Sequence, residues 1–254
     1  MNVWRDRAQL LDVVRESAIS DFRMKYNDSV LGYVWGLLSP IVMLVIYVTV
    51  FRHIVGVRGR DYETYVLVGV VFWTFFQDCT FSGLTALTRK SSVLRAVPLP
   101  PVVVVGSGMI STLITLGINT LLLTLVLSIR GALSPLAPLA LLPIACLALL
   151  AAGTGFFVAL AYVSFRDAGL MWHTALQALF WMTPIVYPVE SESLAQVLYL
   201  NPIARCVYLI RWFMTADYLP ATRFIVLTVL FCCGVFALGL WSFVRRQSTI
   251  PESL

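Results

Sequence analysis

Long stretches without charged residues alternate with short polar ones along most of the chain. Six such stretches contain at most one charged residue each, at positions 29–51, 65–87, 102–129, 135–165, 168–189 and 224–244. An α-helix needs about 20 apolar residues to cross ~30 Å of hydrocarbon, and each stretch reaches that length. The pattern therefore predicts six membrane-spanning helices.

The first 28 residues have a different pattern, in which charges are interspersed with apolar residues. Leu11, Val14, Ala18 and Phe22 recur three or four positions apart, a spacing that puts them on one face of a helix. This predicts an N-terminal amphipathic helix that lies in the membrane interface with its apolar face in lipid. An ordinary helix on the cytoplasmic side is the alternative.

Residues 190–219 fit neither pattern. Their apolar pieces, 194–200 and 203–214, are too short to cross a bilayer, and Asn201-Pro202 interrupts them. We expect a re-entrant helical hairpin between the fifth and sixth spans, because such backbone is tolerated at membrane depth only within protein or beside water.

The patterns together predict an all-α integral membrane protein with a single domain. Its expected parts are the interfacial helix at 1–28, spans one to five at 29–189, the re-entrant segment at 190–219, the sixth span at 220–246 and a polar tail at 247–254.

Composition supports a membrane location. Only 12% of the 254 residues are charged and 59% are hydrophobic, whereas a water-soluble domain has about 25% charged residues. The net charge is +5, but the basic residues flank the apolar stretches, so we expect no nucleic-acid partner. Eleven Lys and Arg residues fall on the side that holds both termini and seven on the other, which favours cytoplasmic termini.

The chain lacks the sequence motifs of the common catalytic and nucleotide-binding sites. It has no G-x-x-x-x-G-K-[ST] phosphate-binding loop, no H-E-x-x-H and no G-x-S-x-G. Its five cysteines form no C-x-x-C pair, and its two histidines have no partner at a useful spacing, so no metal site is expected. The sequence predicts a protein that is not itself an enzyme.

Asp78 is the one acidic residue well inside a predicted span. An intramembrane charge is costly, so Asp78 is a functional-site hypothesis by default. Three interpretations are open: Asp78 faces a pore, pairs with an arginine across a subunit contact, or is hydrated near the end of a tilted helix. The aromatic residues of the first two spans either form interfacial belts or stack on sugar rings in a channel.

Five motifs, in order along nearly the whole chain, resemble one protein family. They read DFRMKY and SVLGYVW within 21–35, P, Y and VF at 40, 47 and 50–51, YVLVG and FWTFF within 65–76, the segment 153–167 ending in SFRD, and TPIVYP at 183–188 with NP at 201–202 and an arginine at 211. They resemble the transmembrane subunits of polysaccharide-exporting ABC transporters of the type 2 class. These move O-antigen, capsular polysaccharide, teichoic acid or related glycans. One departure is AVPLPP at 96–101, near which the family often has Lys-x-x-x-Phe-Pro.

The resemblance implies a channel-forming permease. It implies a homodimer bound to two copies of a separate ATPase subunit, which would hold ATP and magnesium, and no cofactor on this chain. The implied cargo is a polysaccharide linked to polyprenyl pyrophosphate, and the implied location is the bacterial cytoplasmic (inner) membrane. The alternatives are a drug or lipid exporter of the same architecture, an intramembrane enzyme acting on polyprenyl lipids, and a scaffold that transports nothing.

The implied roles fall on four groups of residues. Arginine binds phosphate through a bidentate fork and lysine as a point charge, and the expected pyrophosphate-docking residues are Arg23, Lys25, Leu31, Gly32, Arg89, Lys90 and Arg95. The expected channel-lining residues are Tyr33, Trp35, Phe72, Trp73, Phe76 and Asp78. The expected contacts with the ATPase are Arg89, Arg95, Arg166 and Asp167. The expected outer gate consists of Pro184, Tyr187, Pro188, Asn201, Pro202 and Arg211.

Overall fold

The computed structural model describes residues 7–27, 33–57, 61–91, 99–189, 191, 198–216 and 218–247, and within them the protein is entirely helical. The elements are α1 (Arg7–Asn27), α2 (Tyr33–Val48) continued by the π-helical turn η1 (Thr49–Ile54), α3 (Tyr62–Arg89), α5 (Pro101–Ile129), the 3₁₀ turn η2 (Ala137–Ala140), α6 (Leu141–Ser164), α7 (Ala168–Met182), α9 (Pro202–Thr215) and α10 (Thr222–Arg246). The predicted all-α fold is confirmed for these residues.

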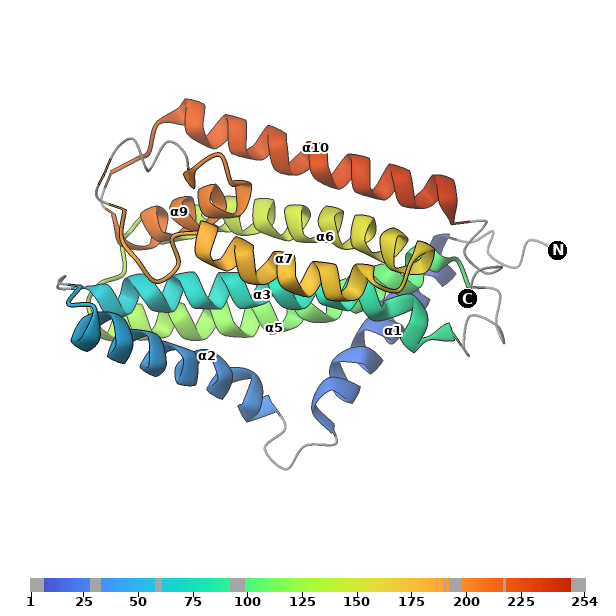
Figure 1. The fold of residues 1–254 in the computed structure, drawn as a ribbon, viewed down its shortest axis with the longest axis horizontal. Helices are drawn as coiled ribbons and strands as arrows, with labels where there is room; N and C mark the ends of the chain where they lie inside the picture. The colour runs from blue at the N-terminus through green and yellow to red at the C-terminus, as the bar shows by residue number, and fades with distance from the viewer. Residues whose placement is uncertain are drawn as a thin grey trace.

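The long helices form a bundle that is built around α3. Helices α3, α5, α6, α7 and α10 run along the long axis of the molecule, with α1 at one end and α9 at the other (Figure 1). We call these the α1 end and the α9 end. Helix α3 packs mainly against α5 and α6, and also against α2, α7 and α9. It is therefore covered on several sides, and Val66, Phe72 and Leu87 are almost completely buried.

Within the described part of the chain, four helices are long and apolar enough to cross a membrane: Tyr62–Arg89, Pro101–Ile129, Ala137–Ser164 and Thr222–Arg246. They correspond to the predicted second, third, fourth and sixth spans, which are confirmed in length and composition. The predicted first span corresponds to α2, which has 16 residues, and to η1, which follows it directly and has 6 residues.

The predicted fifth span at 168–189 is helical over only part of its length. Helix α7 has 15 residues, which at a rise of 1.5 Å corresponds to about 22 Å. It ends at Met182 because Pro184 cannot donate a helical hydrogen bond and disfavours helical backbone at Thr183. The remainder, 183–189, is non-helical. The count of six spans stays a prediction.

Helix α1 occupies the segment predicted to be amphipathic. Ala18 is buried and Val14 and Phe22 are half-buried, whereas Arg15 and Arg23 are exposed. Helix α1 packs against α5. The position of α1 in a membrane interface stays a prediction.

The expected re-entrant segment is described only in part, since 190, 192–197 and 217 lie outside the described residues. Its second half forms α9, whose 14 residues extend about 21 Å and are too short to cross a bilayer. Asn201 caps this helix, because its side-chain oxygen accepts a hydrogen bond from the backbone N–H of Ile203 at 3.0 Å, and Pro202 occupies the first turn. Helix α9 packs against α3, α6 and α10.

Glycines allow a close contact between α6 and α10. A side chain at Gly153 of α6 would lie 2.6 Å from the Cα atom of Phe236 in α10, and one at Gly239 would collide with the backbone of Gly153. Helices α6 and α10 therefore touch backbone to backbone, the type of packing that holds helices together in lipid, where no hydrophobic effect drives association.

Candidate functional site

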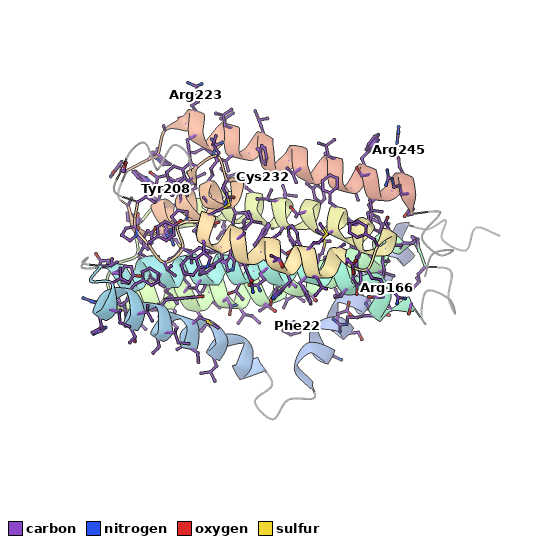
Figure 2. All side chains as sticks on the ribbon, viewed as in Figure 1. Phe22, Arg166, Tyr208, Arg223, Cys232 and Arg245 are labelled. Carbon is purple, nitrogen blue, oxygen red and sulfur yellow. The ribbon has the colours of Figure 1, made fainter. Side chains whose placement is uncertain are left out.

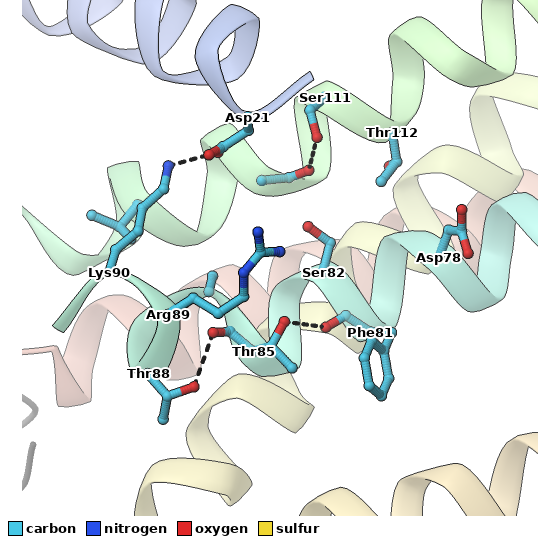
Figure 3. A pocket seen from close by; sticks show the side chains of 13 residues that line it. Asp21, Asp78, Phe81, Ser82, Thr85, Thr88, Arg89, Lys90, Ser111 and Thr112 are labelled. Carbon is cyan, nitrogen blue, oxygen red and sulfur yellow. Dashed lines mark hydrogen bonds and ion pairs between the residues drawn. The ribbon is translucent and has the colours of Figure 1, made fainter. Parts of the chain in front are cut away.

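A polar pocket of about 350 Å³ lies between α1, α3 and α5 at the α1 end. We call it the α1 pocket; Figure 3 shows the side chains that line it. Its polar lining residues are Asp21, Asp78, Ser82, Thr85, Thr88, Arg89, Lys90, Ser111 and Thr112. Three residues named by the sequence, Asp78, Arg89 and Lys90, thus share one pocket.

An ion pair closes one side of the α1 pocket. The Lys90 Nζ atom lies 2.6 Å from the Asp21 Oδ2 atom, and the Ser107 hydroxyl lies 3.4 Å from the same nitrogen. The side chains of Lys90 and Asp21 are 21% and 12% exposed, so the pair is partly shielded from water and salt. This ion pair joins α1 to the end of α3. The Asp21 carboxylate thus balances the positive charge of Lys90.

Arg89 supplies a second cation to the α1 pocket. It is the last residue of α3, its side chain is exposed, and its guanidinium extends into the pocket between Lys90 and Ser82 (Figure 3). Arg89 makes no hydrogen bond or ion pair with any other residue that the structure describes. An anion entering the pocket would therefore find a guanidinium with its donors unused.

Asp78 lies toward the opposite end of the α1 pocket from Lys90 (Figure 3). It precedes Arg89 by 11 residues, or about 16 Å along the helix. The half-buried carboxylate faces an open, polar pocket. Water in the pocket can therefore reach Asp78, although Asp78 lies near the middle of α3.

The predicted outer-gate residues come together at the α9 end around Arg211. Arg211 is 8% exposed, and its guanidinium donates to the backbone oxygens of Pro184 at 2.6 Å, Ile185 at 2.9 Å and Tyr65 at 3.1 Å. A guanidinium titrates so far above neutral pH that Arg211 stays charged.

Two tyrosines of α3 hold the same non-helical segment. The Tyr62 hydroxyl donates to the Val186 oxygen at 2.5 Å, and the Tyr65 hydroxyl lies 2.9 Å from the Pro184 oxygen. The guanidinium carbon of Arg211 lies 3.6 Å from the centre of the Tyr65 ring, within the range of a cation–π interaction. A pocket of about 400 Å³ opens beside these residues.

The break between α7 and α9 is also bridged by side chains. The Asn201 amide donates to the Thr183 hydroxyl at 2.9 Å, and the Tyr187 hydroxyl donates to the Trp181 oxygen at 2.5 Å. These contacts bring Asn201 next to 183–188, whereas Pro188 is an exposed residue at the rim of the pocket.

A third pocket, of about 340 Å³, lies between α2, α3 and α7. We call it the α7 pocket. The Phe180 ring stacks on Tyr47 at 5.5 Å and meets Trp73 edge-on at 5.6 Å. Gln77 and Gln177 add amide groups to the aromatic lining. Aromatic faces beside hydrogen-bonding groups suit the apolar faces and hydroxyls of sugar rings.

Helix α7 exposes a polar and aromatic face that the sequence analysis missed. His173, Gln177 and Trp181 are exposed and spaced four residues apart, so they share one face of the helix. The Nε2 atoms of Gln177 and His173 are 3.3 Å apart. The opposite face is held on α3, where the Trp172 indole donates to the Thr80 hydroxyl at 3.2 Å. The four-residue spacing was the signal in the sequence that could have identified this face.

The predicted channel-lining residues are only partly brought together. Trp73 borders the α7 pocket, but Phe72 and Phe76 are 0% and 2% exposed and belong to the core of the subunit. The side chains of Tyr33 and Trp35 lie outside the described set.

The predicted ATPase contacts lie at the α1 end. Arg166 and Asp167 are exposed in the turn between α6 and α7, and Arg166 is at the same end of the bundle as Arg245 (Figure 2). Among the predicted docking residues, Arg23 is exposed on α1. Leu31, Gly32, Arg95 and the side chain of Lys25 lie outside what the structure describes.

Comparison with known proteins identifies related sequences over most of the chain. The sequence profile of the ABC-2 type transporter family matches residues 15–215. The O-antigen export system permease protein RfbA of Myxococcus xanthus is 26% identical over 211 residues, which cover 79% of this chain and 78% of that protein. An RfbA protein of Klebsiella pneumoniae is 21% identical over 207 residues, 78% of each chain. The polysialic acid transport protein KpsM of Escherichia coli is 20% identical over 242 residues, 92% of this chain and 93% of its own.

The Arg211 contacts predict an unusual sensitivity at Gly69. A side chain there would collide with the Arg211 guanidinium, so Gly69→Val should displace it and lower the free energy of unfolding by about 3 kcal/mol. Gly117→Val is the matched control, because nothing lies within 4 Å of a side chain built there.

Thermal unfolding of the purified chain in detergent measures both effects. Arg211→Met should destabilise the chain about as much as Gly69→Val, and the double variant should lose much less than the sum, since both act on one interaction. Strict additivity, or equal unfolding of the Gly69 and Gly117 variants, would contradict the assigned role of Arg211.

Proposed function

Because the chain belongs to the ABC-2 type transporter family, we propose that it is the permease subunit of an ATP-driven polysaccharide exporter. The cargo would be O-antigen or a related cell-surface glycan, linked to polyprenyl pyrophosphate. Two copies of the chain would form the channel in the bacterial cytoplasmic membrane, with two copies of a separate subunit binding ATP and magnesium. Each chain would cross the membrane six times, with the α1 end and both termini in the cytoplasm.

The face of α7 is the observation that carries this proposal. His173 and Gln177 are exposed on a helix of a strongly apolar bundle. Polar groups exposed to hydrocarbon would be costly, so this face belongs beside water or another chain. Together with the aromatic rings of the α7 pocket, it offers a wet surface on which sugar rings stack and hydrogen bond.

The α1 pocket is the proposed docking site for the pyrophosphate. The N–H donors of Arg89 are unused. Lys90 is paired with the Asp21 carboxylate, and a phosphate oxygen could take the place of that carboxylate because it is also an anionic hydrogen-bond acceptor. Entry of pyrophosphate would therefore compete with Asp21 for Lys90. Because Asp21 lies on α1, this competition would loosen the contact between α1 and α3.

The proposed route continues from the α1 pocket past α7 to the cluster around Arg211. Trp73 and Tyr47 of the α7 pocket, with Phe180 and Trp181, replace the buried Phe72 and Phe76 as its aromatic lining. The segment 183–188 and α9 would gate the outer mouth. Nucleotide-driven movement of the partner ATPase would act on Arg166, Asp167 and the end of α3.

The docking proposal predicts a loss of export for Arg89→Ala. A hydrogen bond between charged groups contributes about 1.5–3 kcal/mol, so export should fall roughly tenfold or more. Arg15→Ala is the matched control, because Arg15 is an exposed arginine of α1 that does not line the α1 pocket. Surface polysaccharide is measured by quantitative immunoblot in a strain that lacks the native chain, with equal amounts of permease in the membrane. Equal export by both variants would contradict docking at Arg89.

The α7 face generates a separate prediction. Gln177→Leu removes an amide without removing bulk, and loss of a hydrogen bond worth about 1 kcal/mol should slow export roughly fivefold. Gln177→Asn keeps the amide and should retain most of the activity. The same immunoblot gives the rate after induced expression, and unfolding temperature checks the fold. Wild-type export by Gln177→Leu would show that this face does not border the path of the glycan.

A further inference from the structure

The α1 pocket has hydroxyl groups that the docking of a pyrophosphate leaves without a role. Arg89 and Lys90 supply N–H donors where α3 ends. Ser82 of α3 and Ser111 of α5 line the pocket from opposite sides (Figure 3), and Thr85 of α3 lines it as well. The hydrogen bonds of these hydroxyls show which kind of ligand group they fit.

The hydroxyl hydrogens of Thr85 and Ser111 are already used within their own helices. The Thr85 hydroxyl donates to the Phe81 backbone oxygen at 3.0 Å. The Ser111 hydroxyl donates to the Gly108 backbone oxygen at 2.7 Å. A hydroxyl has one donor and two acceptor lone pairs, and neither oxygen accepts a hydrogen bond from another residue that the structure describes. Both oxygens can therefore accept from a ligand that carries donors, whereas the oxygens of a pyrophosphate diester only accept.

The donor and acceptor groups follow one another along one face of α3. Ser82, Thr85 and Arg89 are three and four residues apart, a spacing that keeps side chains on the same face of a helix. The helix rises about 10 Å from Ser82 to Arg89. On α5, a side chain at Gly108 would come within 2.8 Å of the Ser82 Oγ atom, so the glycine leaves room for that hydroxyl. A ligand lying along this face would meet the guanidinium first and the hydroxyls next.

Phe81 adds an aromatic surface to the same pocket. Its side chain is 46% exposed, so a ligand can reach the ring. An aromatic ring packs well against the apolar C–H face of another ring. A sugar ring combines such a face with several hydroxyl donors, and both features match this part of the lining.

We propose that the α1 pocket also binds the first sugar of the cargo, the one bonded to the pyrophosphate, and so selects which glycans are exported. This inference rests on the proposed docking of the pyrophosphate at Arg89. The sugar then lies against Phe81, and its hydroxyls donate to the side-chain oxygens of Thr85 and Ser111. A sugar whose hydroxyls do not reach these oxygens loses the hydrogen bonds and binds more weakly.

Titration calorimetry of the full chain, purified in detergent, tests this site with soluble diphosphates. Each probe is a methyl diphosphate whose second ester group is glucopyranosyl, galactopyranosyl, mannopyranosyl or, as the reference, cyclohexyl, a ring of the same size without hydroxyls. We expect at least one sugar probe to bind about tenfold more tightly than the reference, as two neutral hydrogen bonds would give. Thr85→Val combined with Ser111→Ala removes both acceptors and should reduce this difference to less than about threefold.

Two further variants separate the sugar site from the docking proposal. Thr124→Val removes a hydroxyl of α5 that donates to the Thr120 oxygen of its own helix at 2.8 Å and does not line the pocket, so it should keep the tenfold difference. Arg89→Ala should weaken the sugar probes and the reference about equally.

The outcomes distinguish the two proposals. If Arg89→Ala weakens the reference but no sugar probe binds more tightly than the reference to the wild-type chain, the sugar site is overturned and pyrophosphate docking stands. A full tenfold difference in the variant that lacks both acceptors would overturn the sugar site in the same way. If Arg89→Ala leaves binding of the reference unchanged, the docking proposal fails, and the sugar site fails with it.

Discussion

The structure depends on how a non-helical segment is accommodated inside a bundle of apolar helices. Backbone groups between Thr183 and Pro188 have no helical partners, and buried backbone groups that lack a hydrogen bond are costly. Arg211 supplies donors to the oxygens of Pro184 and Ile185, while Tyr62 and Tyr65 of α3 supply others. One buried side chain thus allows α7 to end early and fixes α9 against α3. Gly69 is needed because the guanidinium occupies the space beside it.

Among the described residues, three sites with polar side chains lie along the bundle. The α1 pocket holds Arg89 and the pair formed by Lys90 and Asp21. The α7 face presents His173 and Gln177 beside a group of aromatic rings. The Arg211 cluster and the pocket beside it lie at the α9 end. The proposed export of a lipid-linked glycan would use these three surfaces in order: cations at the α1 end, aromatic and amide groups beside α7, and the proposed gate at the α9 end.

The sequence was most informative for features that a single physical property is enough to identify. Length and absence of charge identified the helices at 62–89, 101–129, 137–164 and 222–246, and the clustering of cations after the second span pointed to Arg89 and Lys90. The same criterion overextended the fifth span, because 183–189 is uncharged but has its helix broken by Pro184. Phe72 and Phe76 were assigned to a channel because periodicity cannot distinguish a helix covered on several sides from one that faces a pore. The contact of Asp21 with Lys90 joins residues 69 positions apart, and no local pattern encodes it.

Co-purification from native membranes tests the central claim most directly, namely that this chain is a permease driven by a separate ATPase. The tagged chain is purified in a detergent that preserves a known exporter complex, the bound proteins are identified by mass spectrometry, and ATP hydrolysis is measured. The account predicts an ATPase with a Walker motif at one copy per permease and turnover that vanadate inhibits. Recovery of the chain alone, without ATP hydrolysis, would contradict it.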